Sequence, residues 1–242
     1  LEKRIGVPVV ARPYQQAWLS KIVAGKVKQG AAKLYKKKQK WYIALSITWE
    51  VESSQGERIM GVDLGLRYLA VVAVGTKSLF FKGNQCAYIR RRFAARRSKL
   101  GKAKKLDAIR KSKDKESRWM KDHNHKISRQ IVNHALVNGV GVIRMEDLTD
   151  IRNRAKSKKE AGRNLHSWAF CQLKEMIKYK AEMVGIRFEE VKVEYTSQTC
   201  KCGHREKANR KGLVFKCKKC GYTTHADLNG AINIGKAISG LA

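Results

Sequence analysis

The chain has 242 residues and a formal net charge of +33, from 53 Lys plus Arg against 20 Asp plus Glu. Hydrophobic residues make up 43% of it, enough for a buried core, which excludes a disordered basic tail. Such an excess of charge favours a polyanionic partner, nucleic acid rather than a membrane, because no apolar run approaches the ~20 residues of a spanning helix.

The first segment, residues 1–56, has no secretory signal. "LEKRIGVPVV" lacks an initiator Met and a long apolar stretch, so we expect the chain to begin partway through a longer polypeptide in a reducing compartment. A turn is predicted at Arg12-Pro13. "AAKLYKKKQKWYIALSITWEV" then predicts two strands around a basic turn, because the second run is rich in aromatic and β-branched residues.

The next segment predicts an antiparallel meander. "RIMGVDLGLRYLAVVAVG" reads as two apolar strands, about 58–64 and 68–74, on either side of a turn at Gly65. "SLFFKG" adds a third short strand. Asp63 stands inside the first strand, where an aspartate is disfavoured, and is therefore a candidate functional residue.

Basic helices are predicted from about Ala87 to Asn138, with Lys and Arg around most of the circumference of the first. "VGVIRME" follows as a buried strand that ends at Glu146. After a basic loop come the amphipathic helix "HSWAFCQLKEMIKYKAEMVG" and the strand "IRFEEVKVEYT".

Four of the six cysteines cluster near the end of the chain, at Cys200, Cys202, Cys217 and Cys220. Each pair is followed by glycine, which favours tight turns around a metal, and clustered cysteines in a reducing compartment predict zinc rather than disulfides. The first pair is one residue tighter than the usual C-x2-C. His204 is therefore an alternative ligand.

Three acids are candidates for a divalent cation site: Asp63, Glu146 and Asp227, the last at the predicted start of the final helix. Carboxylates are the ligands that Mg²⁺ prefers, and paired Mg²⁺ ions suit attack on a phosphodiester. Each acid also has an ordinary interpretation. Asp227 alone would be a helix N-cap, Glu146 a solvated strand end, and Asp63 the partner of an arginine.

Together, "GVDLGLRYLAVV", "IRMEDLTDIR", "YTSQTCKCGHR" and "CKKCGYTTHADLNGAINI" resemble the TnpB family of transposon-encoded nucleases, which are similar to type V CRISPR effectors. The resemblance implies a mixed α/β fold of the ribonuclease H-like (RuvC) type. A nuclease core at 57–195 would carry the basic helical insertion at about 87–138 and be followed by a zinc ribbon at 196–224 and a last RuvC segment at 225–242. Residues 1–56 would be the remnant of a β-rich front domain that binds guide RNA and duplex.

The same resemblance implies that Asp63, Glu146 and Asp227 are catalytic Mg²⁺ ligands and that the four cysteines hold a structural Zn²⁺. The implied function is RNA-guided cleavage of DNA in a prokaryotic cytoplasm, with guide RNA and target DNA as partners and a front-portion polypeptide or a second copy as further candidates. The alternatives are a non-cutting repressor and a strand-transfer transposase. The residues predicted to bind nucleic acid are Arg90, Arg91, Arg92, Arg96, Arg97, Lys102, Lys104, Lys105, Arg152 and Arg154.

Overall fold

The computed structural model describes residues 6–37, 39–147, 166–192 and 195–237. The chain divides into two compact units, Leu1–Glu52 and Ser53–Ala242. The boundary predicted from the sequence follows residue 56. The first unit contains α1 (Pro13–Val23) and a hairpin of β1 (Lys28–Lys37) and β2 (Lys40–Thr48). The hairpin agrees with the two predicted strands.

Helix α1 was not predicted, because Arg12-Pro13 reads as a turn in the sequence. Proline is well tolerated in the first turn of a helix, where its missing N–H would have no partner in any case. The Arg12 N–H donates to Oε1 of the Gln15 side chain, at 2.8 Å. Trp18 of α1 packs against Trp49, with ring centroids 4.8 Å apart. The predicted turn is thus the start of a helix.

The second unit is built on a five-stranded mixed sheet with the order β5-β4-β3-β6-β7. Its strands are β3 (Arg58–Asp63), β4 (Tyr68–Val74), β5 (Lys77–Lys82), β6 (Val140–Glu146) and β7 (Arg187–Val191). Strands β3, β4 and β5 form the predicted antiparallel meander, whereas β6 pairs in parallel with both β3 and β7. Strands β3, β5, β6 and β7 therefore run in the same direction, and their C-terminal ends lie at the same end of the sheet.

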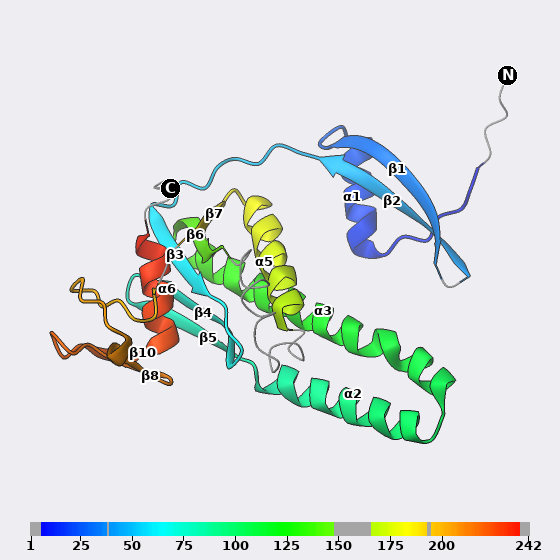
Figure 1. Ribbon diagram of the computed structural model, residues 1–242. Coiled ribbons are helices and arrows are strands. Elements are labelled where there is room, and N and C mark those ends of the chain that lie inside the picture. Colours follow the sequence, from blue (N-terminus) through cyan, green and yellow to red (C-terminus); the bar gives the residue numbers. More distant parts are fainter. Residues whose placement is uncertain (1–5, 38, 148–165, 193–194, 238–242) are drawn as a thin grey trace. The chain divides into compact units, whose positions relative to one another are not determined.

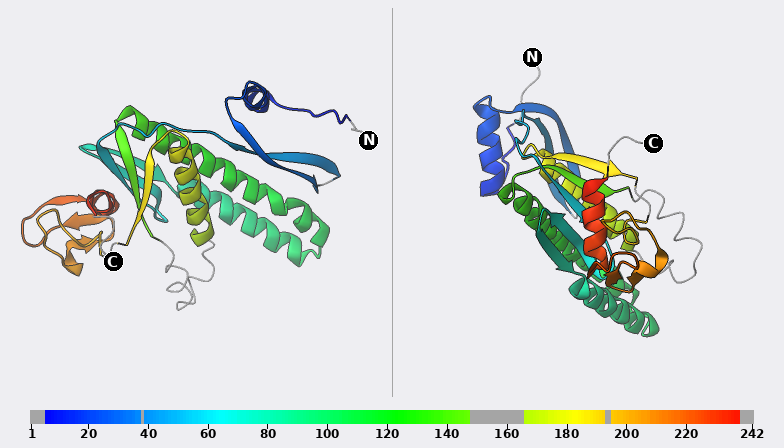
Figure 2. Two further views of the ribbon diagram at one scale, coloured as in Figure 1. Left: turned by 90° about the horizontal axis from the view of Figure 1, so that it is seen from above. Right: turned by 90° about the vertical axis from the view of Figure 1, so that its left-hand side faces the viewer.

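Helices cover both faces of this sheet. On one face lie α3 (Leu106–Val137) and α5 (His166–Glu182), and on the other lies α6 (Ala226–Lys236), which Figure 2 shows end-on in its left view. α2 (Asn84–Lys102) runs beside α3 as the predicted basic insertion (Figure 1). The main core fills the α3–α5 side, where Met60, Val62 and Ile131 are fully buried.

The cysteine region forms a small three-stranded antiparallel ribbon between β7 and α6. Its strands are β8 (Arg210–Lys211), β9 (Val214–Lys216) and β10 (Thr223–His225), in the order β10-β9-β8. β10 leads into α6 without a break, so the ribbon adjoins the N-terminus of that helix (Figure 1). None of the helices in the described ranges has both the length and the apolar composition needed to cross a bilayer.

Candidate active site

The sheet and α6 bring the three predicted acids close enough for Asp227 and Glu146 to act electrostatically on Asp63. Asp63 ends β3 and Glu146 ends β6, and because Val62 pairs with Met145 in this parallel ladder, the two acids occupy neighbouring positions at the strand ends. Side chains alternate along a strand, so both acids point away from the buried Val62 and Met145, toward the face that α6 covers. Asp227 lies in the first turn of α6.

Glycines allow α6 to lie almost in contact with the backbone of β3. A Cβ at Gly61 would stand 1.9 Å from the carbonyl oxygen of Ala231, and one at Gly230 would stand 2.9 Å from Asp63 Oδ2. Only glycine fits at such an approach. Gly230 therefore leaves the space that the Asp63 carboxylate occupies, one helical turn beyond Asp227.

We predict that Gly61→Ala pushes α6 away from the sheet. The methyl group would meet backbone rather than a flexible side chain, so the expected loss of stability is about 3 kcal/mol, the upper end of the overpacking range. Thermal unfolding measures it. Gly101→Ala is the matched control, because Gly101 is helical with open space around it and should tolerate the methyl. Equal melting temperatures for the two variants would contradict the proposed packing.

Arg144 fixes the other end of α6. Its Nη1 donates to the carbonyl oxygens of Gly235, at 3.1 Å, and Ala237, while its Nε donates to Glu189 Oε2 at 2.7 Å. A cation at a helix C-terminus satisfies the last carbonyl groups and opposes their partial negative charge. Arg144 is thereby a positioning residue for α6 that was not identified from the sequence.

Two asparagines of α6 attach the start of the ribbon to the helix. Asn229 Nδ2 donates to the carbonyl oxygens of Thr196 and Thr199 at 3.1 and 2.8 Å, and Asn233 Nδ2 donates to the same two oxygens at 2.7 Å. Four residues apart, they lie on one face of the helix. The motif "ADLNGAINI" therefore combines an acid, small residues that face β3 and amides that bind the ribbon.

The site is acidic enough to perturb its own titration. Burial, together with the charges of Asp227 and Glu146, raises the pKa of Asp63 to about 7, while Arg210 acts in the opposite direction. Such a shift marks a group whose charged form lacks a counter-ion. Three carboxylates from three elements are a donor set that suits hard divalent cations such as Mg²⁺.

Asp227 has two contacts with residues of the ribbon. Arg210 Nη2 in β8 lies 3.1 Å from Asp227 Oδ1, and His225 Nδ1 at the end of β10 accepts from the Asp227 N–H at 3.2 Å. The His225 ring is enclosed edge-to-face by Tyr68 and Phe80. The simple interpretation of Asp227 as the N-cap is wrong, because His225 is the N-cap. Arg210 and His225 were not identified from the sequence.

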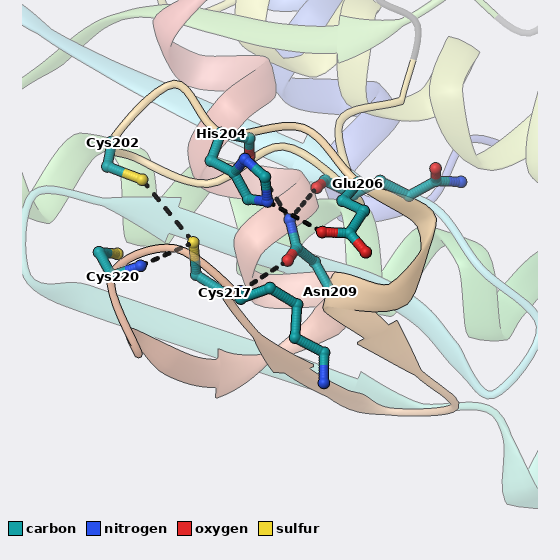
Figure 3. A network of polar contacts seen from close by, with 8 residues as sticks. Cys202, His204, Glu206, Asn209, Cys217 and Cys220 are labelled. Carbon is teal, nitrogen blue, oxygen red and sulfur yellow. Dashed lines mark hydrogen bonds and ion pairs between the residues drawn. The ribbon is translucent and has the colours of Figure 1, made fainter.

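The four cysteines form a compact group, of which Figure 3 shows Cys202, Cys217 and Cys220. Cys200 Sγ lies 3.6 Å from Cys220 Sγ, Cys202 Sγ lies 3.7 Å from Cys217 Sγ, and all four sulfurs lie within 4.8 Å of one another. A tetrahedral Zn²⁺ with Zn–S bonds of ~2.3 Å requires S···S distances of about 3.8 Å. The thiols therefore fit zinc, despite the short first pair.

His204 is not part of this group. Its Nε2 lies 3.1 Å from Glu206 Oε2, and within the described part of the ribbon the compact cluster of candidate zinc ligands comprises the four sulfurs without it. Gly203 and Gly221 both have positive φ, +85° and +73°, as expected for the turns that follow each pair.

A buried asparagine joins the two cysteine turns. Asn209 Nδ2 donates to the Gln198 carbonyl oxygen at 3.0 Å, next to the first pair, and its Oδ1 accepts from the Lys218 N–H at 2.8 Å, within the second (Figure 3). The residue is 1% exposed, so these bonds are shielded from water. Asn209 thus helps to bring the pairs together, a role without a signal in the sequence.

The predicted nucleic-acid contacts lie mostly in solvent. Seven of them are exposed on α2 and the turn after it: Arg91, Arg92, Arg96, Arg97, Lys102, Lys104 and Lys105. Arg97 also forms an ion pair with Glu116 of α3, which gives it a role in holding the two helices together. Arg90 is half-buried, and Arg152 and Arg154 lie outside the described residues.

Comparisons with known proteins show which families the chain resembles. Residues 35–152 match a family described as "Probable transposase", and residues 170–234 match the "Cas12f1-like, TNB domain". A CRISPR-associated endodeoxyribonuclease Cas12f1 of Sulfoacidibacillus thermotolerans is 31% identical over 97% of this chain, and a TnpB-like protein of Methanocaldococcus jannaschii is 29% identical over 97% of it.

A solved structure shows the same fold. The cryo-EM structure of a CRISPR-Cas12f ternary complex superposes with a TM-score of 0.63 at 25% identity, covering 93% of this chain. The likeness confirms the predicted α/β fold with its mixed sheet. The chain spans 59% of the length of the Sulfoacidibacillus protein, 87% of the Methanocaldococcus protein and 48% of the chain in the complex.

Proposed function

Because the chain belongs to the TnpB family, we propose that it is a divalent-metal-dependent DNA endonuclease directed by a guide RNA. The observation that carries the proposal is the meeting of Asp63, Glu146 and Asp227 at one edge of the sheet in a chain of charge +33. The raised pKa of Asp63 supports it, because carboxylates that repel one another gain from a shared cation.

The three carboxylates are the residues that would hold Mg²⁺, and the bound metal would supply an activated water and stabilise the leaving oxygen. The protein's own contribution is positioning. Gly61 and Arg144 set the place of α6, and His225 fixes the backbone at Asp227. Arg210 adds a cation beside Asp227 that is suited to a phosphate oxygen once metal neutralises the carboxylates.

The basic helices supply the remaining chemistry. Exposed arginines and lysines of α2, such as Arg92 and Arg96, can bind phosphates without reading sequence, so guidance must come from base pairing between guide and target. The four cysteines would hold Zn²⁺ as a structural ion, because their four sulfurs would leave no coordination position open for substrate or water.

The test is a cleavage assay with Mg²⁺, a guide RNA and either a matched or a mismatched DNA target. We expect cutting of the matched target, none in the absence of Mg²⁺, and free ends as products. Joined strands would indicate a strand-transfer enzyme, which the "Probable transposase" family description makes the second candidate. Tight binding of matched DNA with no cutting at any Mg²⁺ concentration would instead identify a repressor.

A further inference from the structure

A second concave site lies beside the edge strand of the sheet. A cavity of about 540 Å³ opens where β5, the start of α2 and the middle of α3 meet, elements that adjoin in Figure 1. Its volume falls in the range of small-molecule sites, about 300–1,000 Å³. The lining includes Phe81, Lys82, Gln85, Trp119, His123 and Gln130.

One wall of the cavity is a preformed aromatic stack. The rings of Trp119 and His123 are nearly parallel, with centroids 4.9 Å apart and an angle of 14° between their planes. Trp119 also packs against the main core, so the stack is rigid. A planar ligand gains most from such a wall, because stacking on aromatic side chains is worth ~1–3 kcal/mol for a nucleobase.

His123 offers an unused hydrogen-bonding atom. Its Nε2 is buried and has no hydrogen-bond partner in the part of the chain that the structure describes. Burial, and then the charge of Lys126, lower the pKa of His123, so the ring is neutral at pH 7 and has one donor and one acceptor nitrogen. Buried polar atoms in native proteins are almost always paired, so a missing partner indicates a ligand or water.

The rest of the lining is amide and cationic. Gln85 and Gln130 can each donate and accept, which suits the edge of a base. Lys82 and Lys126 supply positive charge, and Lys126 Nζ lies 2.7 Å from Asp122 Oδ2, the one carboxylate of the lining. A purely anionic ligand would not need the aromatic wall, and an apolar ligand would not need the lysines and amides. The combination matches a nucleotide.

The cavity lies at the end of the sheet that carries the three carboxylates, but on the face that α3 covers, whereas the carboxylates lie on the face that α6 covers. Asp63 pairs with Val71 of β4, and Val71 pairs with Phe80 of β5, so Phe80 and Asp63 stand in one row two strands apart, about 10 Å. Phe80 lines the cavity, and its ring also contacts His225, the N-cap before Asp227. Phe80 of the outermost strand therefore adjoins both the cavity and His225.

We propose that this cavity binds one unstacked nucleotide of a single strand that passes the three carboxylates. The base stacks on the Trp119–His123 wall, and its edge bonds to the side-chain amides of Gln85 and Gln130. Lys82 and Lys126 bind the flanking phosphates. The proposal rests on the proposed function, because a nucleic-acid strand is expected to pass the three acids only if they form the cleavage site. DNA and RNA strands share the required chemistry.

The test measures binding of the full chain to ten-residue oligothymidylate and oligouridylate in Mg²⁺-free buffer, where no cleavage interferes. Trp119→Leu should raise the Kd about 5- to 100-fold on the strand that the cavity accepts. Replacing one nucleotide at a time by an abasic residue should raise the Kd of the parent chain at one position. With the abasic residue at that position, Trp119→Leu should not raise the Kd further, because the base that Trp119 stacks against is already absent.

Surface variants provide the controls. Lys126→Ala should weaken binding more than Lys121→Ala, which removes the same charge from an exposed position of α3 outside the cavity. If Trp119→Leu does not fold, the exposed pair Gln85→Ala/Gln130→Ala gives the decisive comparison with the parent chain. A loss with only one of the two oligonucleotides assigns the subsite to DNA or to RNA.

Two outcomes would overturn the proposal in different ways. Unchanged affinity in the cavity variants of a chain that still cleaves DNA with Mg²⁺ would remove the nucleotide subsite and leave the nuclease intact. Failure of the parent chain to bind either strand would remove both the subsite and the proposed function.

Discussion

Asp63→Asn is expected to abolish Mg²⁺-dependent cleavage and, at the same time, to stabilise the metal-free protein at pH 8. Cleavage should fall at least about 10²–10³-fold, the loss that follows removal of one preorganised electrostatic group. Binding of nucleic acid should persist, because the basic surface of α2 is untouched. Cleavage of a labelled target and filter binding measure the two effects separately.

The stabilisation follows from the raised pKa. The pKa of Asp63 is about 7 in the fold and ~3.9 in the unfolded chain, so the folded state binds the proton more tightly. The stabilisation from protonated Asp63 is therefore fully present below about pH 4, and it is lost as the pH rises through 7. Asparagine carries no charge to bury. The variant should exceed the parent by about 1–3 kcal/mol at pH 8 and match it near pH 4.

Thermal unfolding across this pH range is the measurement, with about 2–4 °C expected for each kcal/mol in a domain of this size. Added Mg²⁺ should stabilise the parent and not the variant, because a ligand of the folded state raises its stability. Asp107→Asn is the matched control, since the Asp107 side chain is 84% exposed, forms an ion pair with Arg110 and lies in α3, outside the acidic site. Equal stability of the parent and Asp63→Asn at pH 8 without Mg²⁺ would contradict the claim that burial and the neighbouring carboxylates destabilise charged Asp63.

Cys217→Ser is expected to release the zinc and, through the ribbon, to disable the nuclease site. We expect about one Zn²⁺ per parent chain and much less in the variant, because serine is a poor replacement for a thiolate ligand. The ribbon has few buried apolar residues of its own, chiefly Cys200, Phe215 and Cys217, so we expect its folding to depend on the metal.

The consequence for the active site is geometric. Arg210 and His225 both belong to the ribbon and both contact Asp227, so an unfolded ribbon leaves the third carboxylate unrestrained. Cleavage should fall by more than about tenfold, as when a supporting contact of a metal ligand is lost, while the sheet remains folded. Elemental analysis, circular dichroism and hydrogen exchange at the start of α6 report these changes.

His204→Ala separates the two ligand sets that the sequence left open. Because His204 pairs with Glu206 outside the sulfur group, this variant should keep its zinc and most of its activity. Zinc loss equal to that of Cys217→Ser would show that the histidine replaces a cysteine. Normal cleavage by a zinc-free Cys217→Ser protein would separate the ribbon from the active site altogether.

Parts of the candidate site could be predicted from the sequence where a residue type is unusual in its local sequence context. Asp63 stands in an apolar strand, Glu146 ends another, and the cysteine pairs with their glycines are short-range patterns that turn geometry explains. The meander, the basic helices and the strand order of the first three strands follow from periodicity and short connections. These features depend on neighbours within a few residues, which a sequence displays directly.

The supporting residues depend on contacts between distant segments, and only the tertiary structure decided them. Arg144 meets the end of α6 some 90 residues later, Arg210 meets Asp227 across the ribbon, and Asn209 joins two turns. In sequence, an arginine in a chain of charge +33 is indistinguishable from the surface arginines of α2. Pro13 likewise reads as a turn until the helix after it is seen. Local chemistry therefore identified the candidate ligands, and long-range packing determined which residues support them.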